Sequence, residues 1–294
     1  ILRALFGGLN RCVPTMKTWK YLEGFLSVRD PNEVVETEPS LLAAEIVFVV
    51  IFVALVTHAL LCKRRDLQLL FLSSLASGWA IELLAILHPQ LNNMWHAQAT
   101  LMLLEQEEPV WMLCSYAWLL YTPTALVLTA GEMTSAPLFS ALLATLLFYP
   151  VDIVGAKHLW WTWHNSDPLY EERDRFMPYA SPLWIMTFTC ALACCIQVVK
   201  KFFGVARSFF VMLLQSVCVG VLSNVLMHAL MVLLYHAPKS MTAETEAPWG
   251  MRDGYRTFKL LCLAAASLEL LIWGIKGRLS WSFPRLVQGE PVVL

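Results

Sequence analysis

The feature that most constrains this chain is a series of long apolar runs, each close to the length that crosses a bilayer. A hydrocarbon core about 30 Å thick is spanned by an α-helix of about 20 mostly apolar residues. The runs are continuous, whereas the strands of a membrane barrel alternate in hydrophobicity over about ten residues. The seven runs occupy residues 41–62, 67–88, 110–130, 136–156, 181–199, 209–235 and 258–275. The sequence therefore predicts an all-α fold, a polytopic transmembrane helical bundle with about seven transmembrane helices.

Composition and charge agree with a membrane location and exclude one class of partner. Of the 294 residues, 58% are hydrophobic and 15% are charged, whereas about a quarter of the residues of a soluble domain are charged. The net charge of -1 provides no basic surface for a phosphate backbone. We therefore expect an integral, multi-pass membrane protein, in a membrane that composition does not specify. Lipid is its expected partner, and nucleic acid is not.

The chain is expected to form one membrane domain with two flanking segments. We expect an extramembrane or interfacial segment over residues 1–40, a seven-helix transmembrane domain over 41–277 and a C-terminal tail over 278–294. Basic and aromatic side chains within residues 1–30 fit either a short segment lying on the membrane surface or a solvated tail. No internal repeat divides the bundle.

Basic residues in the short loops predict the orientation of the bundle, because Lys and Arg collect on the cytosolic side of membrane helices. Basic groups follow the first, fifth and seventh runs, which end on the same side: Lys63, Arg64 and Arg65; Lys200, Lys201 and Arg207; Lys276, Arg278 and Arg285. The loop at 88–109, on the opposite side, has no Lys or Arg. Although Arg173, Arg175 and the basic N-terminal tail oppose this orientation, we expect the N terminus outside or lumenal and the C terminus in the cytosol.

Three polar side chains lie at positions in the spans where exposure to lipid would cost free energy: Glu82, Asp152 and Asn224. A charged group at mid-bilayer costs about 2.5 to 3.5 kcal/mol, so such groups normally face the interior of a bundle. The second, fourth and sixth helices run in the same direction, and a rise of about 1.5 Å per residue places the three groups in one layer. We expect them to line a common cavity on the less basic side. The alternative is a packing seam joined by interhelical hydrogen bonds.

Histidines gather just beyond this layer. Six of the seven lie in the stretches 88–96, 158–164 and 228–236. Neutral imidazoles bind metals and carry protons. The paired histidines are six or eight residues apart, unlike the four-residue spacing that puts two ligands on one helical face, so we expect no metal site and leave any cofactor open. The cysteines lie mostly in apolar runs without a C-x-x-C pair and are expected to be reduced packing residues.

Polar and aromatic side chains that could carry a function are most concentrated in residues 149–168, which read YPVDIVGAKHLWWTWHNSDP. A longer fourth helix would place Asp152, Trp160 and Trp163 on one face. Tryptophans at a membrane boundary usually form a belt that anchors the helix, which explains them without any chemistry. A belt does not explain the polar groups of the same segment, which are Asp152, His164 and Asp167.

This stretch resembles the signature of an uncharacterised family of eukaryotic multi-pass membrane proteins, W-W-T-W-H followed by a variable pair and D-P. Residues 160–168 read WWTWHNSDP. A second element, residues 92–98 reading NNMWHAQ, is similar to that family's Asn-Phe-Trp-His-Ser-Gln, with Met94 and Ala97 as departures. The resemblance covers about residues 41–275 and implies a multi-pass topology without an activity.

A fainter resemblance concerns the integral-membrane carotenoid hydratases and lycopene cyclases. It rests on Asp152 followed by W-x-W and on a Pro-rich aromatic helix start at residues 177–184. Those enzymes protonate a polyene with buried acids. The resemblance therefore implies isoprenoid or lipid chemistry.

Three classes of function fit these residues. The first is a membrane-embedded enzyme acting on a lipid or isoprenoid substrate, in which buried carboxyl groups act as acid or base and histidines carry protons. The second is a transporter, proton-coupled carrier or receptor, and the third is a membrane scaffold or assembly subunit. The candidate catalytic residues are Glu82, Asp152, His96, His164 and Asp167. The candidate substrate-binding residues are Asn93, Trp95, Asn224, His228, Trp160 and Trp163.

The orientation can be tested by labelling single-cysteine variants in sealed vesicles. With seven spans, positions near Arg65 and Arg278 are expected to react with a membrane-impermeant thiol reagent from the same, cytosolic side. Labelling of these two positions from opposite sides would contradict the number of spans.

Overall fold

The computed structural model describes residues 20–22, 25–88, 94–104, 107–130, 136–163, 173–174 and 176–236. Six helices in this part of the chain are long and apolar enough to cross a membrane. They are Pro39–Leu61, Arg65–Leu87, Val110–Thr129, Ala136–Lys157, Ala180–Phe202 and Phe209–Tyr235. They confirm the first six spans of the predicted all-α bundle, while the predicted span at 258–275 lies outside the described residues.

Four of these helices are single α-helices: α3 (Pro39–Leu61), α4 (Arg65–Leu87), α7 (Ala136–Lys157) and α8 (Ala180–Phe202). The third span is divided into α5 (Val110–Tyr116), the π-helical turn η1 (Ala117–Tyr121) and α6 (Thr122–Thr129). Pro123 has no backbone N–H, and in a regular α-helix its ring would clash with the carbonyl oxygen four residues earlier. The wider π-helical turn before Pro123 relieves this clash. The sixth span comprises α9 (Phe209–Met231) and the π-helical turn η3 (Val232–His236).

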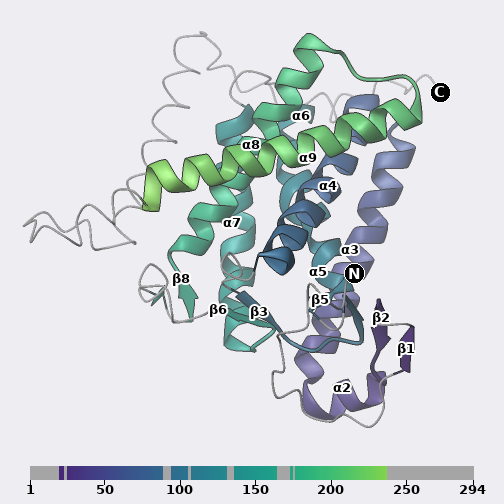
Figure 1. Ribbon diagram of the computed structural model, residues 1–294, viewed down its shortest axis with the longest axis vertical. Helices are drawn as coiled ribbons and strands as arrows, with labels where there is room; N and C mark the ends of the chain where they lie inside the picture. Colours follow the sequence, from purple (N-terminus) through teal and green to yellow (C-terminus); the bar gives the residue numbers. More distant parts are fainter. Residues whose placement is uncertain are drawn as a thin grey trace, which may run out of the picture.

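Small residues bring α4 and α9 into close contact. Helix α9 packs on α4 and α8, and Figure 1 shows it crossing the other helices obliquely. A Cβ added to Gly220 would lie 2.9 Å from the backbone carbonyl carbon of Ala76. Next to this contact the Ser77 and Ser223 hydroxyl oxygens are 2.8 Å apart. Small residues and an interhelical contact between hydroxyl groups therefore form a packing seam between these two helices.

Charged side chains join two of the predicted cytosolic loops at one end of the bundle. The Asp66 carboxylate is 2.8 Å from Arg64 Nη2 and 3.3 Å from Lys200 Nζ. Arg65 Nη1 donates to the backbone oxygen of Arg207 at 2.6 Å. These contacts place the basic loops after α3 and α8 side by side, as expected for loops that follow the first and fifth spans. The third basic group lies outside the described residues.

Short strands and one short helix cover the opposite end (Figure 1). One sheet has the order β1-β2-β4-β5, and two further pairs are β3-β6 and β7-β8, all antiparallel. The sequence did not predict these strands, because two or three residues are too few to show an alternating pattern. Their bounds are β1 (Lys20–Leu22), β2 (Leu26–Val28), β3 (Met94–His96), β4 (Leu101–Leu103), β5 (Glu108–Pro109), β6 (Trp161–Trp163), β7 (Arg173–Asp174) and β8 (Met177–Pro178), with helix α2 at Pro31–Thr37.

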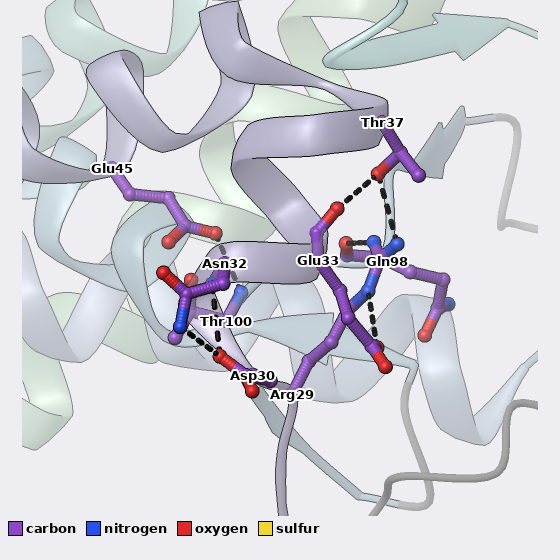
Figure 2. Close-up of polar contacts among 8 residues, drawn as sticks. All are labelled: Arg29, Asp30, Asn32, Glu33, Thr37, Glu45, Gln98 and Thr100. Atoms are coloured by element: carbon purple, nitrogen blue, oxygen red, sulfur yellow. Dashed lines mark hydrogen bonds and ion pairs between the residues drawn. The ribbon is translucent and has the colours of Figure 1, made fainter.

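Polar contacts hold this cap, meaning α2 and strands β1 to β6, together and fix it to the bundle. The buried Arg29 side chain donates to Gln98 O at 3.1 Å and to Thr37 Oγ1 at 3.0 Å, as Figure 2 shows. Glu45, buried near the start of α3, accepts a hydrogen bond from the backbone N–H of Thr100 at 2.7 Å. Segments before the first span and after the second are thereby held on the same helix end.

The close contact at Gly220 gives a stability prediction. We expect Gly220→Ala to lower the free energy of unfolding by about 1–3 kcal/mol, because the added methyl group meets backbone atoms of α4 that cannot move aside. Thermal unfolding in detergent measures the change. The matched control is Val221→Ala on the exposed face of α9, which removes a lipid-facing group and is expected to leave the melting temperature nearly unchanged.

Candidate functional site

Three side chains that sequence analysis did not group together meet beneath the cap. Glu82, His96 and Glu108 each offer one possible ligand atom, and these atoms all lie within 4.8 Å of one another. Glu82 is 8% exposed, and the side chains of His96 and Glu108 are 6% and 3% exposed. We call these three residues the carboxyl–histidine cluster.

The cap brings the members of the cluster together from three elements. Glu82 lies in the last turns of α4. His96 ends β3, where it is paired with Trp161 of β6, so the described parts of the two motifs that carry the family resemblance form one antiparallel ladder. Glu108 begins β5 and is paired with Leu103 of β4. A helix end and two different sheets therefore position the three functional groups.

Tyr116 of α5 connects the cluster to the membrane helices. Its hydroxyl donates a hydrogen bond to Glu82 Oε1, and its ring lies against Gly78, one turn before Glu82. A Cβ on Gly78 would lie 2.2 Å from Tyr116 Cγ. Glycine at this position is thus what allows the tyrosine to reach the carboxyl group.

Burial controls the charge of the two cap residues. It lowers the pKa of His96, an effect that the neighbouring Glu82 partly opposes. Burial raises the pKa of Glu108 well above its ordinary value, and Glu82 raises it further. The distance of 3.8 Å from His96 Nδ1 to Glu108 Oε2 is too long for a hydrogen bond. Burial therefore disfavours the charged form of each of these two groups.

Two polar atoms of the cluster have no hydrogen-bond partner among the described residues. They are His96 Nε2 and Glu108 Oε1. A buried polar atom without a partner costs free energy, so a native protein that keeps one usually has a use for it. Oxygen and imidazole nitrogen donors this close together are able to hold a metal ion or exchange protons. The expectation of no metal site stays a prediction.

Asp152 lies at the same end of the bundle but has its own partners. Trp161 Nε1 donates to its Oδ1 at 2.9 Å, and the Ser181 hydroxyl donates to its Oδ2. These contacts join α7 to β6 and to the start of α8. Among the described residues no hydrogen bond links Asp152 to Glu82, so the structure gives the two acids separate surroundings.

Asn224 belongs to the seam between α4 and α9. Its Nδ2 donates to the backbone oxygens of Ser77 at 3.0 Å and Gly220 at 2.8 Å. His228, one turn later, has Nδ1 2.8 Å from the Asn224 backbone oxygen. Both residues thus have helix-packing contacts, as the seam alternative predicts. The common cavity of Glu82, Asp152 and Asn224 stays a prediction.

The aromatic candidates Trp95 and Trp163 lie in strands of the cap, and Trp160 directly precedes β6. Trp160 Nε1 donates to Ser40 Oγ at 3.1 Å, and its ring stacks on the exposed His158 with 6.0 Å between centroids. Trp163 is buried and Trp95 is exposed. The remaining predicted site residues, Asn93, His164 and Asp167, lie outside the described residues.

Sequence analysis missed Glu108 and Tyr116 as site residues. Glu108 lies in the loop at 88–109, of which only the lack of Lys and Arg was used, although a glutamate followed directly by Pro109 and an apolar helix marks a boundary position. The hydropathy pattern does not distinguish Tyr116 from the other residues of its span. Its role depends on the small residue that faces it on another helix, which a single sequence does not pair.

The contacts of Asp152 predict different outcomes for two substitutions. Asp152→Ala leaves the buried Trp161 N–H unpaired and is expected to lower the free energy of unfolding by about 1–3 kcal/mol. Asp152→Asn keeps an oxygen for Trp161, and its amide is able to donate to the Ser181 hydroxyl, so we expect stability close to wild type. Thermal unfolding of both variants in detergent tests this. Equal destabilisation by the two changes would contradict it.

Comparison with known proteins places the chain in a family. The family described as "Domain of unknown function (DUF7802)" matches residues 14–246. Neither the curated proteins nor the solved structures contain a match to this chain. The match covers both motifs of the sequence resemblance, the cap and the six described spans. The chain is therefore a member of the DUF7802 family, an uncharacterised family whose domain has no known function.

Proposed function

We propose that this protein is a membrane-embedded enzyme that acts on a lipid or isoprenoid substrate at the carboxyl–histidine cluster. The observation that carries the proposal is the convergence of two carboxyl groups and an imidazole within 4.8 Å, from three separate elements. Such a set supplies both an acid and a base to a bound substrate. Structural packing alone would not require three ionisable groups in one buried place.

The surface next to the cluster supports a substrate from the membrane. Trp79, Leu83 and Leu87 are exposed on α4, and their spacing of four residues places them on one helical face. Glu82 is adjacent in sequence to Leu83 but is buried. Apolar chains in the bilayer can therefore approach the helix end where the cluster lies.

A second candidate function, a membrane scaffold, is favoured by the contacts of Asp152 and Asn224. Each has hydrogen-bond partners on a neighbouring element, so each is explained as a connection between elements. That account does not explain why two carboxyl groups and an imidazole converge within 4.8 Å of one another. The enzyme is therefore the better supported proposal.

Lipid and isoprenoid profiles of cells that lack the protein test the proposal. We expect a substrate to accumulate and a product to fall, and expression of the wild-type chain to restore both. His96→Gln removes an imidazole from the cluster and is expected not to restore the profile, because acid–base chemistry is lost. Measuring the amount of protein in the membrane fraction excludes loss by misfolding.

The matched control is His158→Gln, which changes an exposed histidine at the same end of the bundle. This variant is expected to restore the profile fully. A profile that does not change when the protein is absent, or that His96→Gln restores as well as wild type does, would overturn the enzyme proposal in favour of the scaffold.

A further inference from the structure

We propose that Glu82, His96 and Glu108 bind one divalent transition-metal ion, with Zn²⁺ or Fe²⁺ as the best-fitting class. The inference deepens the proposed function and rests on it only in assigning chemistry to this cluster. The binding itself is argued from the geometry, the charges and the unpaired atoms of the three side chains.

Distances in the cluster are close to those of a metal site. With metal–ligand bonds of about 2.0–2.2 Å, neighbouring ligand atoms in a tetrahedral site lie about 3.3 Å apart. His96 Nδ1 and Glu108 Oε2 are already 3.8 Å apart, and all three ligand atoms lie within 4.8 Å of one another. Side-chain shifts of about 1 Å would therefore complete three corners of the site, with the fourth left for water or substrate.

A divalent ion also resolves the charge problem of the cluster. Without an ion, two ionised carboxylates buried this close together would repel each other and lose their hydration, and for this reason burial and Glu82 raise the pKa of Glu108. Binding of a metal ion would release a proton from the carboxyl pair. A bound dication compensates the charges of Glu82 and Glu108 while His96 stays neutral, so the site becomes electrically balanced. The neutral imidazole is also the form that coordinates a metal.

The unpaired atoms provide the second, independent observation. His96 Nε2 and Glu108 Oε1 belong to side chains that are 6% and 3% exposed, and neither atom has a hydrogen-bond partner among the described residues. A buried imidazole that merely packs in a protein interior normally has both nitrogens satisfied or one in contact with solvent. Because Nδ1 is the nitrogen that approaches Glu108, Nδ1 is the ligand atom, and the unpaired Nε2 is left for the outer contact that orients a coordinated ring.

The donor set selects the class of ion. Imidazole nitrogen disfavours Mg²⁺ and Ca²⁺, which prefer all-oxygen sites, and the absence of a thiolate from this set disfavours Cu(I). Two carboxylates and one histidine suit Zn²⁺ and Fe²⁺. Tyr116, which donates to Glu82 Oε1, would orient that carboxylate from outside the coordination sphere as a positioning residue.

Metal content of the purified full chain tests the inference. The chain is prepared in detergent with its affinity tag removed, stripped with a chelator and dialysed against Zn²⁺ or Co²⁺. We expect wild type to retain one ion per chain by elemental mass spectrometry, and the Co²⁺ form to show visible ligand-field absorption. His96→Ala and Glu108→Gln are expected to lose both signals, and Tyr116→Phe is expected to bind about 10–100-fold more weakly.

The control is again the exposed His158, replaced here by alanine, because a surface histidine can collect Zn²⁺ without a site. His158→Ala is expected to keep the stoichiometry and the spectrum of wild type. Glu108→Gln preserves the shape of the side chain, so its melting temperature without metal reports whether the fold survives. Zn²⁺ uptake by wild type that is no greater than uptake by a folded Glu108→Gln variant would overturn the inference.

The two proposals fail in different measurements. If wild type binds no metal but His96→Gln still fails to restore the lipid profile, the metal site is wrong and metal-free acid–base catalysis stands. If wild type binds one ion per chain but cells without the protein have an unchanged profile, the metal site stands and the enzyme proposal is wrong.

Discussion

The burial of two carboxyl groups side by side, at a membrane boundary, is the constraint on which the surrounding structure depends. Glu82 and Glu108 are both withdrawn from solvent, and an isolated charge in such a place costs several kcal/mol. The Tyr116 hydroxyl donates a hydrogen bond to Glu82, while burial lowers the pKa of His96 and raises the pKa of Glu108, which disfavours further charge in the cluster. Each of these partners comes from a different element, so the bundle and its cap must assemble together for the acids to be tolerated.

The cap explains how distant parts of the sequence contribute to one place. Strand β2, which precedes the first span, pairs with β4 in the loop after the second span, and β3 of that loop pairs with β6 after the fourth span. Glu45 and Arg29 fix these strands to α3 and α2. The precision of the cluster therefore comes from backbone pairing outside the membrane, which is more specific in register than packing between apolar helices.

Hydropathy was sufficient to predict the six described spans, because lipid leaves a crossing chain almost no alternative to a helix. The common end of Glu82 and Asp152 also followed from helix direction alone. Their side-chain partners did not, since those depend on the rotation of each helix about its axis. The position of Glu108 depends on β5, which hydropathy does not predict. The pairing of β3 with β6 was also not predicted, because these strands are too short to show periodicity. The flanking domains, the common cavity and the carotenoid-enzyme likeness stay predictions.

Because of the π-helical turn at Ala117–Tyr121, the side-chain contacts of the third span depend on the exact number of residues in that span. Such a turn holds one residue more than a regular helix would, and each residue rotates an α-helix by about 100°. Tyr116, before the turn, faces Glu82, and Tyr121, at its end, has its hydroxyl 2.7 Å from His58 Nδ1. Deleting one residue between them would leave the span hydrophobic and long enough, yet would turn one tyrosine away from its partner. The rotation of one end of this span about the helix axis is thus fixed relative to the rotation of the other end.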